Sequence, residues 1–417
     1  MIIKPMIRNN ICLNSHPVGC AAAVMRQIEY VKKNRPVLAA NGGEEFLRLA
    51  LVIGCSTGYG LASRITAAFG YGAATVGISL EKAASESKPG TPGYYNNLAF
   101  DREARKAGLV SISLDGDAFS DDARARVIEA VKKAAEEAGI PPLVDLVIYS
   151  LASPVRTDPK TGVQYRSVIK PIGQSFSGRT VDMMSGNISV ATAEPANDDE
   201  IANTVKVMGG EDWELWMDAL AGANVLSPKA RSIAYTYLGP ELSWPIYKNG
   251  TIGKAKEDLE RAAKDINNKY RESGKIAGAW VSVNKALVTR ASAVIPIIPF
   301  YVSCLFKVMK EMGLHEGCIE QAVRLFNERL YTVEALVNPT NTQADSEGRI
   351  RIDDWEMRED VQKETAARME KANQENLSSF ADLAGFRQDF MEAHGFGLEG
   401  IDYEADVDPS GLQNPST

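Results

Sequence analysis

The chain has 417 residues, of which 45% are hydrophobic and 24% are charged, and its net charge is −8. This apolar content is enough for a large buried core, whereas the acidic balance argues against general nucleic-acid binding, which needs a basic surface. Five cysteines without CxxC spacing and only three separated histidines predict reduced thiols and no metal site.

The N-terminal residues and the most apolar segment bear on location. Residues 1–5 (MIIKP) lack the apolar core of a signal peptide. The most apolar stretch, residues 291–306, is shorter than a membrane span and contains Pro296 and Pro299, which favours a buried core segment. We therefore expect a cytoplasmic protein without a membrane span.

A strand, a glycine turn and a helix follow one another between residues 49 and 69. Residues 49–53 form an unbroken apolar run, as buried parallel strands do, and Leu61, Ile65 and Ala68 share one face of the following helix. In the turn between them, Gly54 permits the sharp bend, Gly58 lets the backbone approach a pyrophosphate and Gly60 lets helix and strand pack closely. The GxxxGxG spacing in this setting predicts a dinucleotide site of the short-chain dehydrogenase kind.

The second strand, residues 74–80, ends next to Glu81. A carboxylate about 20 residues past the glycine turn accepts hydrogen bonds from the adenosine ribose hydroxyls and repels a 2′-phosphate. The position therefore favours NADH over NADPH, although the neighbouring Lys82 opposes that preference. Taken alone, Glu81 would be interpreted as a solvated charge at the end of a strand.

Strands and helices continue to alternate along the chain. Residues 109–114 and 144–149 are apolar strands, and Ser120 caps a helix expected over residues 121–138. This alternation predicts an α/β fold with a Rossmann-like, doubly wound parallel sheet, which binds ligands at the carboxyl ends of its strands. Two pairs at such ends are candidates for adenine and nicotinamide-ribose contacts: Asp117 with Ala118, and Leu151 with Ala152.

The next part of the chain changes character. Residues 156–203 contain a turn at 158–162 between Thr- and Val-containing segments, which predicts a hairpin excursion that covers the substrate. Its basic side chains are candidates for CoA phosphates and equally for a solvated loop face: Arg156, Lys160, Arg166 and Lys170. Residues 200–221 are expected to form one helix, with Trp213 and Trp216 in the core.

Tyrosines precede a helix that carries two lysines, Lys254 and Lys256. A phenol that donates a proton or hydrogen bond benefits from a lysine that lowers its pKa and holds the nicotinamide ribose. None of the 14 tyrosines has a lysine four positions later, so the Tyr-x3-Lys pair of ketoreductases is absent. Tyr247 precedes both lysines, which point about 200° apart on a helix. Spacing alone leaves the choice of lysine open, and Tyr235 and Tyr237 suit either core packing or a substrate pocket.

The remaining elements lead to a C-terminal extension. Residues 278–283 are expected to form a late sheet strand, and residues 287–289 lead from it into the apolar segment, interpreted as a helix that lines an acyl pocket. A further helix is expected over residues 318–330. We divide the chain into a nucleotide-binding half (1–155), a substrate-binding half that completes the same sheet (156–330) and an α-rich extension with an acidic tail (331–417).

The sequence resembles the NADH-dependent trans-2-enoyl-CoA reductases and the related enoyl-acyl-carrier-protein reductases of the same length. The resemblance covers nearly the whole chain and includes MIIKP (1–5), HPVGC (16–20), GCSTGYG (54–60), GDAFSD (116–121), VIYSLASP (147–154), VMGGEDW (207–213) and HEGCIE (315–320). One departure is the segment at residues 41–48, which replaces a short basic lead-in to the first strand.

The resemblance implies a site and a reaction. The family's Tyr-x8-Lys pair falls on Tyr247 and Lys256, and its substrate-contacting tyrosine falls on Tyr237. NADH then delivers hydride to the β-carbon of the enoyl thioester, Tyr247 hydrogen-bonds the thioester oxygen, and Lys256 holds the ribose and biases the tyrosine. The implied NADH contacts are Gly54, Cys55, Ser56, Thr57, Gly58, Tyr59, Leu80, Glu81, Asp117, Ala118, Leu151, Ala152, Lys256, Leu287, Val288 and Thr289.

The expected activity is therefore reduction of the 2,3 double bond of trans-2-enoyl-CoA in fatty acid metabolism, by a monomer or weak homodimer. Enoyl-acyl-carrier-protein reduction is the alternative. A short-chain ketoreductase would need Tyr-x3-Lys, and a non-catalytic NAD-binding protein would need the nucleotide site without Tyr247 and Lys256. The C-terminal extension carries no flavin fingerprint, so NADH is the cofactor that we expect.

Overall fold

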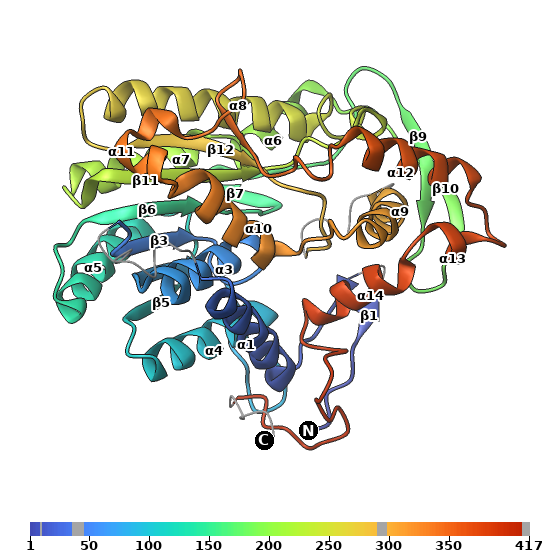
Figure 1. Ribbon diagram of the computed structural model, residues 1–417, viewed down its shortest axis with the longest axis horizontal. Helices are drawn as coiled ribbons and strands as arrows, with labels where there is room; N and C mark the ends of the chain where they lie inside the picture. The colour runs from blue at the N-terminus through green and yellow to red at the C-terminus, as the bar shows by residue number, and fades with distance from the viewer. Residues whose placement is uncertain (9–10, 36–45, 290–297, 411–417) are drawn as a thin grey trace.

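A parallel sheet of seven strands forms the centre of the molecule (Figure 1). The computed structural model describes residues 1–8, 11–35, 46–289 and 298–410. The strand order is β13-β12-β11-β6-β3-β4-β5, and all neighbours are parallel, so the prediction of a doubly wound Rossmann-like fold is confirmed. The strands are β3 (Leu49–Ile53), β4 (Ala74–Ser79), β5 (Ser111–Asp115), β6 (Val144–Tyr149), β11 (Leu226–Thr236), β12 (Gly278–Val283) and β13 (Arg349–Arg351).

Helices cover both faces of the sheet because successive side chains of a strand point to opposite sides. Leu51 of β3 packs into a core formed with α5 (Asp121–Ala138), α7 (Glu211–Gly222) and α8 (Thr251–Ile266). Its neighbour Val52 packs on the other face against η2 (Thr66–Gly70), α10 (Cys318–Leu325) and η5 (Phe326–Leu330). A further core cluster on this face joins α3 (Gly58–Ile65), which continues into η2, with α1 (Pro17–Lys33), α4 (Pro92–Lys106) and α10.

Several predicted elements have the observed bounds. The strands expected over residues 49–53, 144–149 and 278–283 are β3, β6 and β12, and the helix expected over 121–138 is α5. The hydroxyl of Ser120 accepts the backbone N–H of Ala123, which confirms the predicted cap. Trp213 and Trp216 are fully buried, as expected. The third strand, β5, begins at Ser111, two residues later than predicted.

Strand β11 lies in the middle of the sheet between β6 and β12, although its residues were not recognised as a strand. Pro228, Lys229 and Arg231 interrupt its apolar run, and its pairing with β6 is irregular between Leu226 and Arg231. The guanidinium of Arg231 is buried because it donates to the carbonyl of Ala335 at 2.7 Å. This contact across the sequence is what admits a charged residue to a central strand.

The single helix expected over residues 200–221 is wrong. Two helices, α6 (Asp198–Met208) and α7, are separated at Gly209 and Gly210. The break lies against α8: a Cβ at Gly210 would lie 2.2 Å from the Cβ of Ala262, and one at Gly209 would lie 2.5 Å from Asp258. Two glycines therefore allow α8 to approach the break closely.

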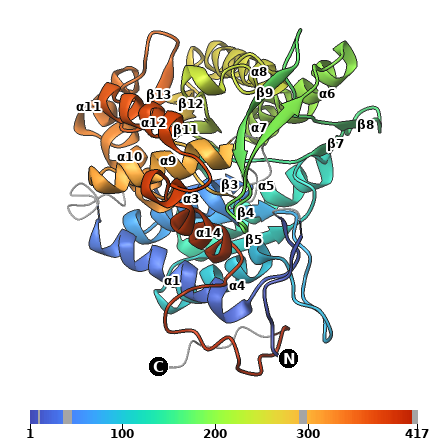
Figure 2. The ribbon, with the colours of Figure 1, turned by 90° about the vertical axis from the view of Figure 1, so that its right-hand side faces the viewer.

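The hairpin excursion predicted near residues 156–203 consists of two hairpins, which confirms it. One is β7 (Val155–Thr157) with β8 (Gln164–Arg166), and the other is β9 (Phe176–Val181) with β10 (Ile188–Ala193). The second hairpin packs against α9 (Ile298–Glu311), as Figure 2 shows. A small N-terminal ladder joins β1 (Ile7–Arg8) to β2 (Ile11–Cys12).

Residues 359–392 of the C-terminal region are largely helical and lie to the right of the sheet in Figure 1. The helices of this region are α11 (Val333–Val337), α12 (Glu359–Lys371), α13 (Leu377–Phe380) and α14 (Leu383–Glu392), and it also supplies edge strand β13. Short helical turns complete the fold at η3 (Glu241–Ser243), η4 (Asn267–Arg271) and η6 (Pro339–Asn341). Residues 41–45 of the unusual lead-in, 291–297 of the apolar segment and 411–417 of the tail lie outside the described residues.

Among the described residues, no helix combines the length and apolarity needed to span a bilayer. Within the same ranges, no group of three or more His, Cys, Asp or Glu side chains is arranged to hold a metal ion. All five cysteines are free thiols.

Candidate active site

A cavity of about 700 Å³ opens at the carboxyl ends of β3, β4 and β6, where the sheet topology predicts a ligand site. Of the predicted site residues, thirteen line it: Gly54, Ser56, Thr57, Gly58, Tyr59, Leu80, Glu81, Asp117, Ala118, Leu151, Ala152, Lys256 and Thr289. The other predicted residues, Cys55, Tyr237, Tyr247, Leu287 and Val288, lie outside its lining.

The glycine turn has the backbone shape that a bound pyrophosphate requires. Gly54 has a φ of 87°, and a Cβ there would lie 2.3 Å from the carbonyl oxygen of Ser150. Gly58 has a φ of 55° and leads directly into α3, whose N-cap Thr57 makes no side-chain cap. A Cβ at Gly60 would lie 2.0 Å from the carbonyl of Gly54. The turn is therefore closed by contacts that exclude side chains, and free N–H groups of α3 face the cavity.

At the ends of β4 and β5, the cavity presents a carboxylate and an apolar surface. Ser56 donates its hydroxyl hydrogen to Glu81 at 2.7 Å, and the Glu81 backbone N–H donates to Asp115 at 2.8 Å. Gly93 of α4 leaves room for that carboxylate, because a Cβ there would lie 2.1 Å from its Oε1. Leu80 is 70% exposed at the cavity, which suits the flat face of an adenine. These residues fit the adenosine portion of a dinucleotide.

Lys256 and Lys254 occupy different environments on α8. Lys256 lines the cavity, where its Nζ donates to the carbonyl of Tyr235 at 3.4 Å, and no carboxylate of the described chain pairs with it. Burial lowers the pKa of Lys256 to about 8. Lys254 is exposed and pairs with Glu257 at 2.8 Å. An ammonium held in a cavity without an anionic partner fits the hydroxyls and phosphates of a dinucleotide.

Tyr247 lies in a buried cluster beside the cavity. Its backbone N–H donates to Ser243 at 2.9 Å at the end of η3, and its ring meets that of Tyr237 edge to face, with centroids 5.1 Å apart. Tyr247 is 7% exposed, and its hydroxyl makes no hydrogen bond to the described residues. The hydroxyl therefore keeps its hydrogen-bonding capacity for a ligand.

The predicted effect of a nearby lysine on the pKa of Tyr247 is wrong in direction. We expected a nearby ammonium to lower the pKa of Tyr247. Instead, burial first and the carboxylate of Glu356 second raise its pKa well above the ordinary value. No hydrogen bond joins Tyr247 to Lys256 in the part of the chain that the structure describes. At neutral pH the phenol is protonated and available as a hydrogen-bond donor.

Comparisons with known proteins agree with this geometry. Family models match three consecutive parts: the NAD(P)H binding domain of trans-2-enoyl-CoA reductase over residues 2–86, its catalytic region over 88–331, and an enoyl reductase FAD binding domain over 344–407. A trans-2-enoyl-CoA reductase [NADH] of Treponema denticola is 57% identical, over 98% of this chain and 99% of its own. The chain belongs to the trans-2-enoyl-CoA reductase family.

Two further comparisons describe other members of the family. An enoyl-[acyl-carrier-protein] reductase [NADH] of Cytophaga hutchinsonii is 53% identical, over 98% of both chains. The crystal structure of the Treponema denticola trans-2-enoyl-CoA reductase in complex with NAD superposes with a TM-score of 0.91, at 55% identity and with 100% of both chains covered.

In this member of the enoyl-CoA reductase family, the cavity also includes residues that we did not predict. Those next to β6 stand at a strand end and could have been found there, but those after β8, in α6 and in α8 carry no local pattern. The additional lining residues are Ser79, Phe119, Tyr149, Ser150, Ser153, Pro154, Ser167, Val168, Ile169, Val207, Met208 and Leu259, while Tyr235, which suited either the core or a pocket, lines the cavity too.

Some of the basic residues in the hairpin excursion form ion pairs within the fold. Arg156 is 2% exposed and pairs with Glu211 at 2.9 Å, and Lys170 pairs with Glu200 at 2.6 Å. Two of the four candidates for CoA phosphates are therefore used within the fold. Lys160 and Arg166 are exposed.

In this member of the enoyl-CoA reductase family, the part that matches an FAD binding domain packs into the core and leaves the cavity to other residues. None of residues 344–407 lines the 700 Å³ cavity. The side chains of Val361, Phe386 and Phe390 are buried in one core cluster with Tyr301 and Leu305 of α9. This part instead reaches the site through Glu356, which accepts a hydrogen bond from Tyr237 at 3.0 Å.

Proposed function

We propose that this chain is an NADH-dependent reductase that saturates the 2,3 double bond of trans-2-enoyl-CoA. The observation that carries the proposal is the cavity in which the glycine turn, Glu81 and Lys256 of a member of this family meet, beside a buried Tyr247. We also propose that residues 1–155 hold the nucleotide, 156–330 hold the substrate and 331–417 support both. The cytoplasmic location and the monomer or weak homodimer stay predictions.

The nucleotide half binds and orients the cofactor. The N–H groups at the start of α3 hold the pyrophosphate, Glu81 accepts from the adenosine ribose, and Asp117 with Ala118 borders the adenine. Lys256, Leu151 and Ala152 hold the nicotinamide ribose, and residues 287–289 hold the nicotinamide. Bound in this way, NADH supplies the hydride that adds to the β-carbon of the enoyl thioester.

Tyr247 acts on the substrate oxygen. As hydride arrives at the β-carbon, negative charge moves to the thioester oxygen, and the protonated phenol donates a hydrogen bond to it. The raised pKa of Tyr247 keeps this proton in place at neutral pH. Tyr237, whose ring contacts that of Tyr247, borders the acyl group. Addition of a proton at the α-carbon completes the saturated thioester.

Reduction of enoyl-acyl-carrier-protein is a second candidate, because a relative that is 53% identical over nearly the full length bears that name. Purified protein should be mixed with NADH and, separately, crotonyl-CoA, crotonyl-acyl-carrier-protein and acetoacetyl-CoA, while NADH absorbance is followed. We expect the fastest loss of NADH with crotonyl-CoA and none with acetoacetyl-CoA. A faster rate with the carrier-protein substrate would favour the second candidate, and no reaction with either enoyl thioester would refute both.

A further inference from the structure

Glu356 is a fully buried carboxylate in the C-terminal region, in the segment between β13 and α12. Its Oε1 accepts hydrogen bonds from the hydroxyls of Tyr301 at 2.7 Å and Tyr237 at 3.0 Å, and its Oε2 accepts the backbone N–H of Ala286 at 2.6 Å. A buried carboxylate is stable only where such donors replace water. The three donors come from different elements, so Glu356 fixes their relative positions.

Two of those donors belong to the reacting side of the site. Ala286 directly precedes Leu287, Val288 and Thr289, and Thr289 lines the cavity opposite Gly58, where a Cβ would lie 3.9 Å from the Cγ2 of Thr289. Tyr237 contacts the ring of Tyr247. A single carboxylate therefore links the loop proposed to hold the nicotinamide to the aromatic pair proposed to hold the acyl group.

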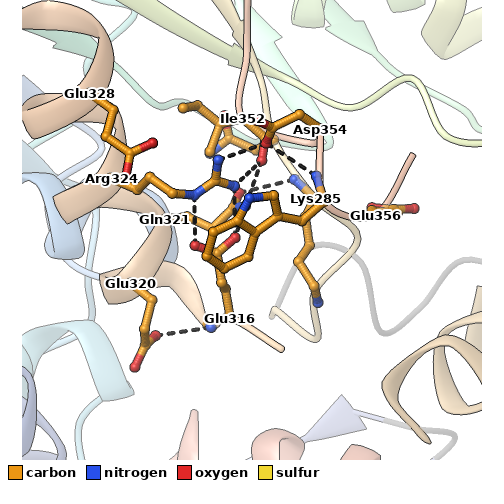
Figure 3. A network of polar contacts seen from close by, with 12 residues as sticks. Lys285, Glu316, Glu320, Gln321, Arg324, Glu328, Ile352, Asp354 and Glu356 are labelled. Atoms are coloured by element: carbon orange, nitrogen blue, oxygen red, sulfur yellow. Dashed lines mark hydrogen bonds and ion pairs between the residues drawn. The ribbon is translucent and has the colours of Figure 1, made fainter. Parts of the chain in front are cut away.

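The segment that carries Glu356 is itself held firmly (Figure 3). Arg324 of α10 forms a two-pronged pair with Glu316 at 2.8 Å, and also binds Asp354 and the carbonyl of Ile352, both at 2.6 Å. The ring of Trp355 stacks on the same guanidinium, 4.3 Å away. This network makes residues 352–356 a rigid base from which the carboxylate projects.

Gln321 ties the same network to the cavity from the other side. Its amide Nε2 donates to Ile352 and Glu316, both at 2.9 Å, while its Oε1 accepts the backbone N–H of Lys285 at 3.0 Å and the hydroxyl of Tyr59 at 3.2 Å. Lys285 and its neighbour Ala286 are thus held from two directions. The loop that follows them starts from a fixed point.

We propose that Glu356 is a positioning residue for the reaction: through Tyr237 and the Ala286 N–H it holds Tyr247 and the nicotinamide loop in register. This inference rests on the proposed function. Burial is the main cause of the raised pKa of Tyr237 and Tyr247, and the carboxylate of Glu356 raises both further, which helps to keep the phenols protonated.

The test compares Glu356→Ala and Glu356→Gln with a matched control, Asp353→Asn. Asp353 is 1% exposed and lies in the same segment, but its carboxylate pairs with Arg351 at 2.7 Å and, within the described part of the chain, accepts no hydrogen bond from Tyr237, Tyr247 or Tyr301. Steady-state kcat and KM with crotonyl-CoA, the NADH Kd and the Tm should be measured for all three and for the unaltered protein. Glu356→Gln is nearly isosteric and keeps the test decisive if Glu356→Ala fails to fold.

We expect kcat to fall about 100-fold in Glu356→Ala and about 10-fold in Glu356→Gln, because a displaced reacting group costs this much when binding is retained. The effect on kcat should exceed that on KM. Asp353→Asn should lower the Tm by about as much as Glu356→Gln does. Its kcat should stay within about 2-fold of the value for the unaltered protein.

A double-mutant cycle tests whether Glu356 acts through Tyr237. In a Tyr237→Phe background, Glu356→Gln should lower kcat by less than about 3-fold, because the effects of substitutions at residues in contact do not add. An equal loss in both backgrounds, or an equal loss of kcat in Glu356→Gln and Asp353→Asn, would overturn the inference. If the unaltered protein fails to oxidise NADH with any enoyl thioester, the proposed function falls; an active protein with a fully active Glu356→Gln variant refutes this inference alone.

Discussion

The nucleotide side of the cavity and its reactive side are built in different ways. The first comes from the ends of strands between residues 49 and 152 and depends on backbone shape, above all at Gly54 and Gly58. The second brings together residues as distant in sequence as Tyr237 and Glu356, through hydrogen bonds between buried side chains. Backbone shape leaves a local pattern in a sequence, whereas a polar network assembled by the fold does not.

The difference also predicts how each side responds to change. A strand-end contact on the nucleotide side stands largely alone, so its loss should alter binding of one part of the cofactor. A member of the buried network shares its partners, and its removal leaves other polar groups unsatisfied. We expect changes on the nucleotide side to act on affinity or cofactor choice, and changes on the reactive side to act on turnover.

The largest effect should come from Tyr247→Phe. Loss of the hydroxyl removes the donor to the thioester oxygen, and loss of one such donor lowers kcat by about 10²- to 10³-fold. NADH affinity, measured by fluorescence titration, should be unchanged. Tyr270→Phe is the control, because that hydroxyl donates to Asp218 and neither residue lines the cavity. Near-normal turnover of the Tyr247→Phe variant would remove the phenol from the mechanism.

Lys256 joins the two sides, and its substitution should have the next largest effect. Lys256→Met should weaken NADH binding by about 10-fold or more, since a partly buried cation is lost next to a dinucleotide, while Lys254→Met should bind normally. The pKa of Lys256 is lowered to about 8, so the side chain is protonated and positively charged below that pH. NADH affinity should therefore fall as the pH rises through about 8. Calorimetric measurement of the NADH Kd between pH 7 and 9 tests this. The same dependence of Kd on pH in Lys256→Met would contradict it.

Cofactor choice should depend on Glu81. Glu81→Ala removes the negative charge that a 2′-phosphate would meet, so kcat/KM for NADPH should rise about 10-fold or more relative to that for NADH. Initial rates with both cofactors at one crotonyl-CoA concentration provide the ratio. Lys82→Ala at the adjacent exposed position removes the opposing positive charge, so it should move the ratio in the other direction. A ratio that does not move in Glu81→Ala would show that the preference is set elsewhere.

The smallest effect should come from an ordinary helix cap outside the buried network of Glu356. Asn197 accepts the N–H of Glu200 at 2.8 Å, and Glu200 returns the contact at the start of α6. Asn197→Ala should lower the free energy of unfolding by about 1 kcal/mol, measured by urea denaturation, with no change in kcat. A kcat that falls together with stability would mean that turnover tracks stability in general, which would weaken the distinction between the two sides.

Much of the sheet follows from local patterns. The unbroken apolar runs of β3, β6 and β12 and the capped, amphipathic α5 identify themselves within a few residues of sequence. Strand β11 does not, because the guanidinium of Arg231 is held in the core by Ala335 and by the ring of Tyr331, about 100 residues away in sequence. The division between α6 and α7 likewise depends on how closely α8 approaches Gly210. Both outcomes are decided by packing partners that no short window contains.

The site divides along the same line. Gly54, Gly58, Glu81, Asp117 and Leu151 were predictable because they stand at or just after strand ends, and all of them line the cavity. The choice of Tyr247 with Lys256 came from the family resemblance, and the structure places Lys256 rather than Lys254 at the cavity. Glu356 has no local pattern, since a single acidic residue after a short strand would be interpreted as a surface charge.

Edge strand β13 has a consequence for biosynthesis. It pairs with β12 only after residue 349 has been translated, although β12 itself ends at Val283. Until then a nascent polypeptide on the ribosome exposes an unpaired, apolar sheet edge, the kind of surface that chaperones bind and that aggregates in their absence. A messenger truncated before codon 349 should therefore yield inclusion bodies rather than a shortened enzyme, as fractionation of a cell lysate would reveal.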